Sequence, residues 1–226
     1  REQTVATSTT RKRRTRADGE RSYQLIVNAA ARLATIEGLE GLSIGRLADE
    51  IGMSKSGLYA HFDSKQDLQL AAIDAAEAVY DTEVVAPAMQ APEGVKRLEL
   101  LCDRYLSYVE RGVFPGGCFF AATAAEWDTR RGPIRQRVRA ILDGWTKLVE
   151  ANLRQAQEQG DLQPGADPHQ ISFEINALLH EANGHYLLFR DTAALDRART
   201  AIRDRLAHPG GVRASGRPRA VTPRSR

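Results

Sequence analysis

Cysteine is scarce in this sequence, since only Cys102 and Cys118 occur among its 226 residues. Two cysteines do not make the disulfide framework of a small secreted domain, and they do not make a metal cluster. Long apolar runs are absent too, because none approaches the roughly 18 residues that a membrane-spanning helix needs. The first residues are polar and basic and lack the apolar core of a secretion signal. We therefore expect a cytoplasmic protein with no metal site, no cofactor and no membrane partner.

The common signatures of enzymes are missing as well. The chain has no Gly-x-Ser-x-Gly elbow, no phosphate-binding loop and no His-Glu-x-x-His motif. One alternative is an enzyme that uses Cys118 with His180 or His185, but Cys118 has no base next to it in the sequence. A free cysteine is commonly a small buried apolar residue. We expect no catalytic activity, and a redox-sensing Cys118 stays open as an alternative.

Acidic residues are rare at both ends of the chain. Residues 1–18 hold six Arg or Lys and two acids, and residues 208–226 hold five Arg and no acid. The whole chain has a net charge of +3, so residues 19–207 carry −6. Tails of this composition are typically disordered. We expect disordered basic tails over 1–18 and 208–226, which are either simply solvated or hold DNA phosphates without sequence preference.

Between the tails, apolar residues recur every three or four positions, and no segment keeps the period of two that is typical of strands. This pattern predicts an all-α fold of about nine helices. Prolines at positions 87 and 92 interrupt the pattern. We expect an N-terminal three-helix domain over 19–79 and a second helical domain over 80–207. The expected helices cover residues 20–37, 44–51, 55–61, 64–87, 95–109, 118–128, 133–159, 168–190 and 193–206.

Residues 42–65, LSIGRLADEIGMSKSGLYAHFDSK, have the pattern of a helix-turn-helix, with the motif itself over 42–61. Ser54 is a good N-cap for the second short helix, and Gly52 suits a left-handed backbone in the turn. The second helix has small and polar residues on its outer face, which is typical of a helix in the DNA major groove. Lys55 at its start can donate to guanine.

This segment resembles the tetracycline-repressor (TetR) family of transcription regulators, strongly over 19–79 and in general architecture beyond. The resemblance rests on Gly41-Leu42-Ser43, Leu47-Ala48, Gly52, Ser54, Leu58-Tyr59, His61-Phe62 and Ser64-Lys65-x-x-Leu68. It implies that Lys55 and Ser56 face bases, while Ser43, Tyr59 and Lys65 hold phosphates. The full set of predicted DNA contacts is Ser43, Arg46, Lys55, Ser56, Tyr59, His61 and Lys65.

One position departs from the family pattern. Members often carry a polar or basic residue where this chain has Gly45, and glycine has no side chain with which to read a base. We therefore expect specificity to rest on Lys55, Ser56 and His61.

The resemblance also implies an effector cavity in the second domain. Residues 116–119, Gly-Gly-Cys-Phe, are similar to a segment found in one TetR subgroup. The candidate cavity residues are aromatic or polar side chains among apolar neighbours: Tyr105, Phe119, Trp127, Trp145, His180 and Tyr186. Such walls suit a small, largely apolar effector.

A homodimer interface is the second implied feature of that domain. The helix that starts at Pro168 is apolar on more than one face, which indicates burial on two sides. A fully buried core helix is the alternative. The predicted interface residues, on this helix and the last one, are Ile175, Leu179, Ala182, Leu195, Ala198, Ile202 and Leu206.

Together these features predict a repressor that binds palindromic double-stranded operator DNA as a homodimer and is released by a small-molecule effector. The alternative is a DNA-binding regulator without an effector response, either architectural or redox-responsive through Cys118. A DNA complex that a small molecule dissociates distinguishes the two.

Overall fold

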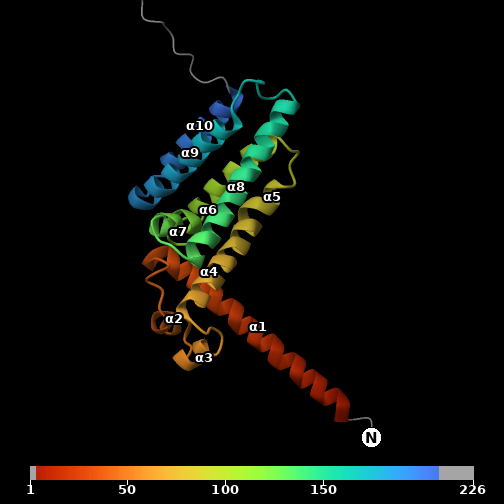
Figure 1. Ribbon diagram of the computed structural model, residues 1–226, viewed down its shortest axis with the longest axis vertical. Helices are drawn as coiled ribbons and strands as arrows, with labels where there is room; N and C mark the ends of the chain where they lie inside the picture. Colours follow the sequence, from red (N-terminus) through yellow and green to blue (C-terminus); the bar gives the residue numbers. More distant parts are fainter. Residues whose placement is uncertain (1–3, 209–226) are drawn as a thin grey trace, which may run out of the picture.

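The computed structural model describes residues 4–208, and the side chains of residues 18–208. All regular structure in this range is helical, so the predicted all-α class is confirmed (Figure 1). A π-helix, η1 (Asp81–Val85), joins α4 to α5. The other helices are α1 (Thr4–Glu37), α2 (Ile44–Ile51), α3 (Lys55–Tyr59), α4 (Lys65–Tyr80), α5 (Ala86–Ala88), α6 (Val95–Glu110), α7 (Phe119–Trp127), α8 (Pro133–Glu158), α9 (Pro168–Phe189) and α10 (Ala193–Ala207).

Serine N-caps explain where three of the helices begin. The hydroxyl oxygens of Ser43, Ser54 and Ser64 each accept a hydrogen bond from the backbone N–H three residues later, at 3.1–3.2 Å. Each bond satisfies an N–H group that the first turn of a helix leaves without a partner. The predicted starts of α2, α3 and α4 are confirmed.

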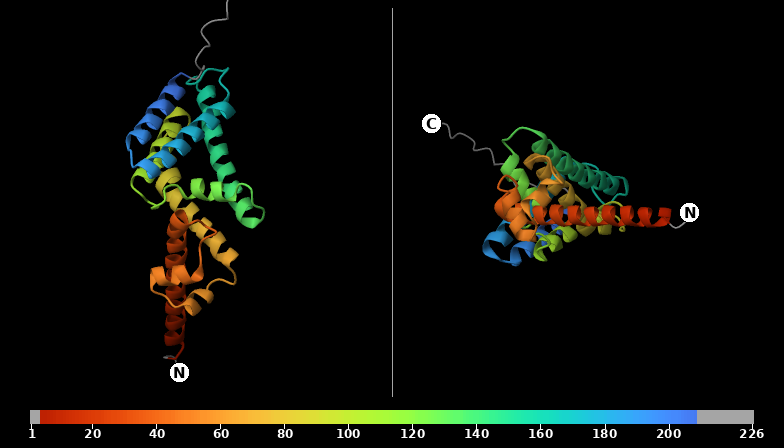
Figure 2. Two further views of the ribbon diagram at one scale, coloured as in Figure 1. Left: turned by 90° about the vertical axis from the view of Figure 1, so that its left-hand side faces the viewer. Right: turned by 90° about the horizontal axis from the view of Figure 1, so that it is seen from below.

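Helix α1 begins much earlier than the sequence pattern predicted. Its backbone is helical from Thr4, so the predicted disorder of residues 4–18 is wrong, and its N-terminal half extends beyond the rest of the molecule (Figures 1 and 2). The stretch contains no proline and several good helix formers. Adding residues to an existing helix is far easier than starting a new one, so α1 can propagate outward. The predicted C-terminal tail lies outside the described residues, apart from His208.

Helix α4 does not end at a linker. The helical backbone continues through η1 and α5 to Ala88, so Pro87 lies inside the helical run. Proline is tolerated there because it occupies the first turn of α5, where its missing N–H costs little. One continuous helical segment therefore connects the neighbourhood of α3 to the C-terminal helices.

The two ends of the molecule share one apolar core. The core includes Leu47 and Leu58 from the helix-turn-helix, Ile73 from α4, and Leu98 and Phe119 from the C-terminal part. Helices α2 and α3 lie at one end, and α9 and α10 pack side by side at the other (Figure 2). No helix in the described range is both long enough and apolar enough to cross a lipid bilayer.

Candidate functional site

The turn between α2 and α3 has the geometry that the sequence predicted. Gly52 is left-handed, with φ 65°, and the N–H of Met53 donates to the carbonyl of Ala48 at 3.0 Å. Leu47 and Leu58 are completely buried and hold the two short helices together. This arrangement leaves the outer face of α3 in solvent, as a helix that enters the major groove requires.

Three of the predicted DNA contacts lie on the exposed face of α3. Lys55 and Ser56 occupy its first turn, and the Tyr59 ring is 62% exposed. Lys55 forms no ion pair with any described residue. Its side chain crosses Gly45, where a Cβ atom would lie 3.3 Å from the Lys55 Cε and 3.4 Å from its Nζ. The missing side chain at Gly45 therefore makes room for Lys55.

Two other predicted contacts are engaged within the chain. Arg46 donates to Glu37 at 2.9 Å and to Glu50 at 2.8 Å. Both hydrogen bonds raise the pKa of Arg46, and the bond to Glu50 has the larger effect. The Lys65 ammonium donates to the backbone carbonyl of Glu40 and lies 3.5 Å from its carboxylate. Each cation must leave these partners before it can reach a DNA phosphate.

The last two predicted contacts are placed differently. Ser43 is exposed, and its hydroxyl caps α2. His61 follows the end of α3, and its half-buried ring lies 6.4 Å from the Tyr23 ring of α1 and 6.4 Å from the Phe62 ring. His61 therefore lies against the body of the domain, beside the surface that Lys55 and Tyr59 present.

Three of the six predicted effector residues line one internal cavity. Tyr105, Trp145 and His180 surround a space of about 60 Å³ between α4, α6, α7, α8 and α9. The other lining residues are apolar or aromatic and include Tyr80 of α4. The indole N–H of Trp145 donates to Asn176 at 2.8 Å, which fixes the orientation of that ring.

The other three predicted residues lie elsewhere. Phe119 is completely buried and packs against Phe120, with 5.3 Å between ring centroids. Trp127 lines a separate cleft between α7 and α8 and carries the Arg130 guanidinium 4.9 Å above its ring. The Tyr186 hydroxyl donates to the carbonyl at the end of α6. None of these three lines the internal cavity.

The environment of the two thiols argues against cysteine chemistry. Cys102 and Cys118 are 3% and 4% exposed. Burial raises the pKa of Cys118, and it raises the pKa of Cys102 to about 12. Because the thiolate is the reactive form, neither side chain has the character of a nucleophile or of a redox sensor.

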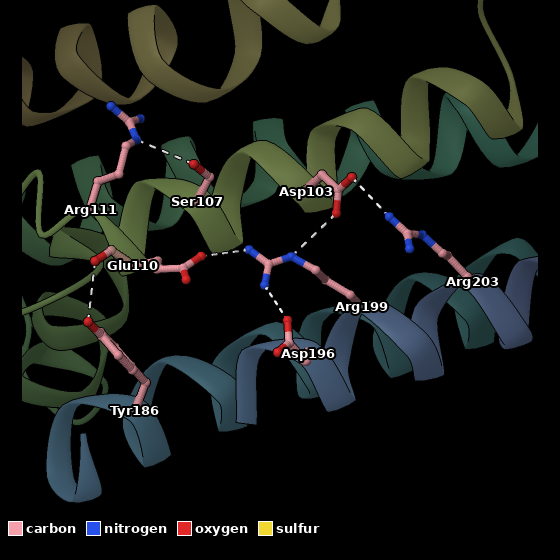
Figure 3. A network of polar contacts seen from close by, with 8 residues as sticks. All are labelled: Asp103, Ser107, Glu110, Arg111, Tyr186, Asp196, Arg199 and Arg203. Carbon is pink, nitrogen blue, oxygen red and sulfur yellow. Dashed lines mark hydrogen bonds and ion pairs between the residues drawn. The ribbon is translucent and has the colours of Figure 1, made fainter. Parts of the chain in front are cut away.

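The predicted dimer residues face the core of their own chain and not its surface. All seven are buried in the core of the single chain, with exposed fractions of 0–4%. These residues do form apolar stripes, as predicted, but the stripes pack against α6, against α8 and between α9 and α10. A polar network, in which Arg199 contacts Glu110 and Asp103 and Arg203 contacts Asp103, holds the same side of α10 onto α6 (Figure 3).

A different stripe of α9 is available to a partner. Phe173 is 70% exposed and Leu188 is 75% exposed. Ala177 and Gly184 are exposed between them. Positions 173, 177, 184 and 188 differ by four, seven and four residues, so they lie on one face of the helix. Exposed apolar side chains that share a face are typical of an interaction surface.

The C-terminal part contacts the helix-turn-helix part through α7 and the loop before it. The Glu126 carboxylate of α7 accepts hydrogen bonds from the backbone N–H groups of Leu39 and Glu40, both at 2.8 Å. In the loop, the N–H of Gly116 donates to the Thr35 hydroxyl at 3.1 Å. A Cβ atom on Gly116 would lie 1.8 Å from the Thr35 carbonyl oxygen, so only glycine fits there. We refer to the contacts of Glu126 and Gly116 as the α7 junction.

Comparison with known proteins agrees with this geometry. A family model described as "Bacterial regulatory proteins, tetR family" matches residues 26–72, which contain α2 and α3. A second model, described as "Tetracyclin repressor-like, C-terminal domain", matches residues 94–202. The chain belongs to the TetR family.

Individual TetR relatives support the same conclusion. A TetR transcriptional regulator from Chloroflexus aurantiacus J-10-FL is 29% identical, with a TM-score of 0.77 over 84% of this chain and 96% of that one. The regulator LmrA of Bacillus subtilis (strain 168) is 28% identical over 141 residues, which are 59% of this chain and 72% of LmrA. AibR, solved with isovaleryl coenzyme A and operator DNA, shares the fold, with a TM-score of 0.67 and 23% identity over 83% of this chain and 98% of AibR. This TetR-family chain is a DNA-binding transcription regulator and not an enzyme.

Two important residues of this TetR-family regulator were not predicted. Tyr80 continues the four-residue spacing of Leu68, Ala72 and Ala76, so its place on the inner face of α4 was readable from the sequence. Glu126 binds backbone groups more than 80 positions away. No local pattern marks such a contact.

Proposed function

We propose that this regulator represses transcription by binding a palindromic operator as a cytoplasmic homodimer, and that a small effector releases it. The observation that carries the proposal is the exposed face of α3, where Lys55 forms no ion pair within the described chain. A cation at the first turn of such a helix can donate to guanine O6 and N7. Residues 19–79 would bind DNA and residues 80–207 would bind the effector and the second subunit.

The exposed stripe of α9 supports the homodimer. Phe173, Ala177, Gly184 and Leu188 would pack against the same residues of a second copy, as a two-fold interface requires. The small residues in the middle allow the two helices to approach closely. Such an interface at one end of the molecule sets the distance between the two α3 helices at the other end. Operator half-sites about 34 Å apart, or one helical turn of DNA, would match a dimer of this kind.

The internal cavity supports effector control. AibR carries both an acyl-coenzyme A ligand and operator DNA on the same fold. In this chain the aromatic walls of the cavity suit a small, largely apolar effector. Two routes link it to the helix-turn-helix: the continuous α4–η1 segment and the α7 junction. The close fit of Gly116 against Thr35 agrees with membership of a Gly-Gly-Cys-Phe subgroup.

The experiment tests dimerisation and DNA binding together. Phe173→Glu places a charge on one of the two large apolar residues of the proposed interface, so the chain should sediment as a monomer and lose tight binding to an inverted-repeat duplex in a mobility-shift assay. Gln136→Glu adds the same charge to an exposed position of α8 and should leave both properties unchanged. A Phe173→Glu protein that remains dimeric and binds like the wild type contradicts the proposed interface.

A further inference from the structure

A groove on the surface lies next to the internal cavity. The groove has a volume of about 240 Å³ and lies between α8 and the segment formed by α4 and η1. Tyr80, Ile141 and Trp145 line both the groove and the internal cavity. The Tyr80 and Trp145 rings are in contact, so these residues form a wall that the groove shares with the cavity.

Aromatic rings dominate the wall between the two spaces. The Tyr80 ring meets the rings of Phe120 and Trp145 edge-to-face, with centroids 5.8 and 5.7 Å apart, and lies 6.4 Å from Tyr105. The π-faces of tyrosine and tryptophan carry negative electrostatic potential and attract organic cations as well as apolar groups. The walls alone thus fit a neutral apolar molecule and an apolar cation.

The charges of the groove decide between these two ligands. Glu77 and Asp81 line the groove, and none of the described residues that line the groove or the cavity is a lysine or an arginine. Glu77 and Asp74 share the single guanidinium of Arg137. Asp81 is exposed and forms no ion pair with a described residue. An excess of carboxylate charge therefore surrounds the entrance.

The one basic side chain of the cavity and a second large cleft show where positive charge lies near this site. His180 of α9 lines the cavity and is the one basic side chain among its described lining residues. The cleft between α7 and α8, with a volume of about 400 Å³, is lined by Arg135 and Arg139 together with Asp128 and Asp143, so its charges balance. Positive charge is thus present on the surface of α8, but it faces another space.

We propose that the effector of this regulator is an organic cation with a compact apolar body. The molecule lies in the groove, with its apolar part against Tyr80 and Trp145 and its ammonium group against Asp81. This proposal rests on the proposed function and narrows its ligand class from apolar molecules to apolar cations. The ammonium would lie against η1, the π-helical turn that continues α4, and π-turns often occur at functional sites.

The test compares two probes of the same shape. Benzyltrimethylammonium is a cation, and 2,2-dimethylpropylbenzene replaces its nitrogen with carbon. Binding to the full chain is measured without DNA, by calorimetry and by the shift in melting temperature. The cation should bind at least about tenfold more tightly than the neutral probe. Equal affinities, tighter binding of the neutral probe, or no binding of the cation at millimolar concentration would overturn the proposal.

Variants then locate the charge. Asp81→Asn should weaken binding of the cation by about three- to fivefold, the range of an exposed ion pair, and leave the neutral probe unaffected. Asp143→Asn removes an exposed carboxylate of α8 that lines the α7–α8 cleft and pairs with Lys147, and both probes should bind as before. If Asp81→Asn and Asp143→Asn give the same affinity for the cation, the groove is not its site.

The outcome is separable from that of the proposed function. Ligand affinity is measured without DNA, and operator binding is measured without ligand. A chain that binds the cation but no operator refutes the regulator and keeps the ligand class. A chain that binds an operator but prefers the neutral probe supports the regulator and refutes the proposed ligand class.

Discussion

The α7 junction makes a quantitative prediction through Glu126. Its carboxylate accepts two backbone hydrogen bonds of 2.8 Å, one from the partly buried N–H of Leu39 and one from the exposed N–H of Glu40. In Glu126→Gln, one amide oxygen still accepts a bond, but the NH₂ group now faces the other N–H. A hydrogen bond to a charged group contributes about 1.5–3 kcal/mol, and the exposed N–H regains water when its partner is lost.

We therefore expect Glu126→Gln to lower the free energy of unfolding by about 1–2 kcal/mol. For a chain of this size that corresponds to a fall of about 3–6 °C in melting temperature, measured by circular dichroism. Glu158→Gln is the matched control, because Glu158 is exposed near the end of α8 and forms no ion pair or side-chain hydrogen bond within the described chain. It should melt within about 1 °C of the wild type, since surface changes of this kind cost little.

A second readout locates the effect. The amide hydrogens of Leu39 and Glu40 should exchange faster with solvent in Glu126→Gln. The amides at the start of α9 and at the end of α10 should not change, because these turns lie at the end of the molecule away from α7 (Figure 1). Equal melting temperatures and equal exchange at Leu39 would show that Glu126 does not hold the two parts together. The contact of Glu126 would then be excluded as a route from effector to DNA.

Three further predictions follow from burial and close contact. Ile202→Glu should unfold the chain rather than only separate a dimer, since it buries an unpaired charge at a position 1% exposed, and a circular dichroism melt distinguishes the two results. Gly45→Arg should displace the Lys55 side chain and change the preferred operator bases while the fold is retained, as measured by competition binding on duplexes altered at single base pairs. Because the folded pKa of Cys102 is raised to about 12, the unfolded chain loses this proton at lower pH than the folded chain, so stability should fall above about pH 9, by up to about 1.4 kcal/mol per pH unit from this group. Urea titrations of the wild type and of Cys102→Ala between pH 8 and pH 10 measure the difference, and an equal pH dependence in both would contradict the assignment.

Local patterns were sufficient to predict most of the fold. The capping hydroxyls of Ser43, Ser54 and Ser64 bind backbone groups only three residues away, so a short stretch of sequence is enough to predict them. The same holds for the left-handed turn at Gly52, which needs a residue without a Cβ atom. These features predicted the helix-turn-helix and the exposed position of Lys55.

Long-range choices were not predictable in the same way. The apolar stripe that contains Ile175 and Leu195 looks the same in the sequence whether a partner chain or the chain's own core covers it. The surface left for a partner is marked by Phe173 and Leu188, which the core-facing pattern does not include. Contacts such as that of Glu126 join distant segments, so they emerge only when the helices are packed.

The most direct test of the account is the selection of binding sites from random double-stranded DNA by the full chain. The wild type should enrich an inverted repeat with half-sites about one helical turn apart. Lys55→Ala should enrich the same repeat with the preference at one base pair of each half-site reduced by about 1–3 kcal/mol, because that side chain is assigned to a base edge. Enrichment of no sequence, of sites without two-fold symmetry, or of an unchanged site by Lys55→Ala would contradict the assignment of α3 as the reading helix of a dimeric operator-binding regulator.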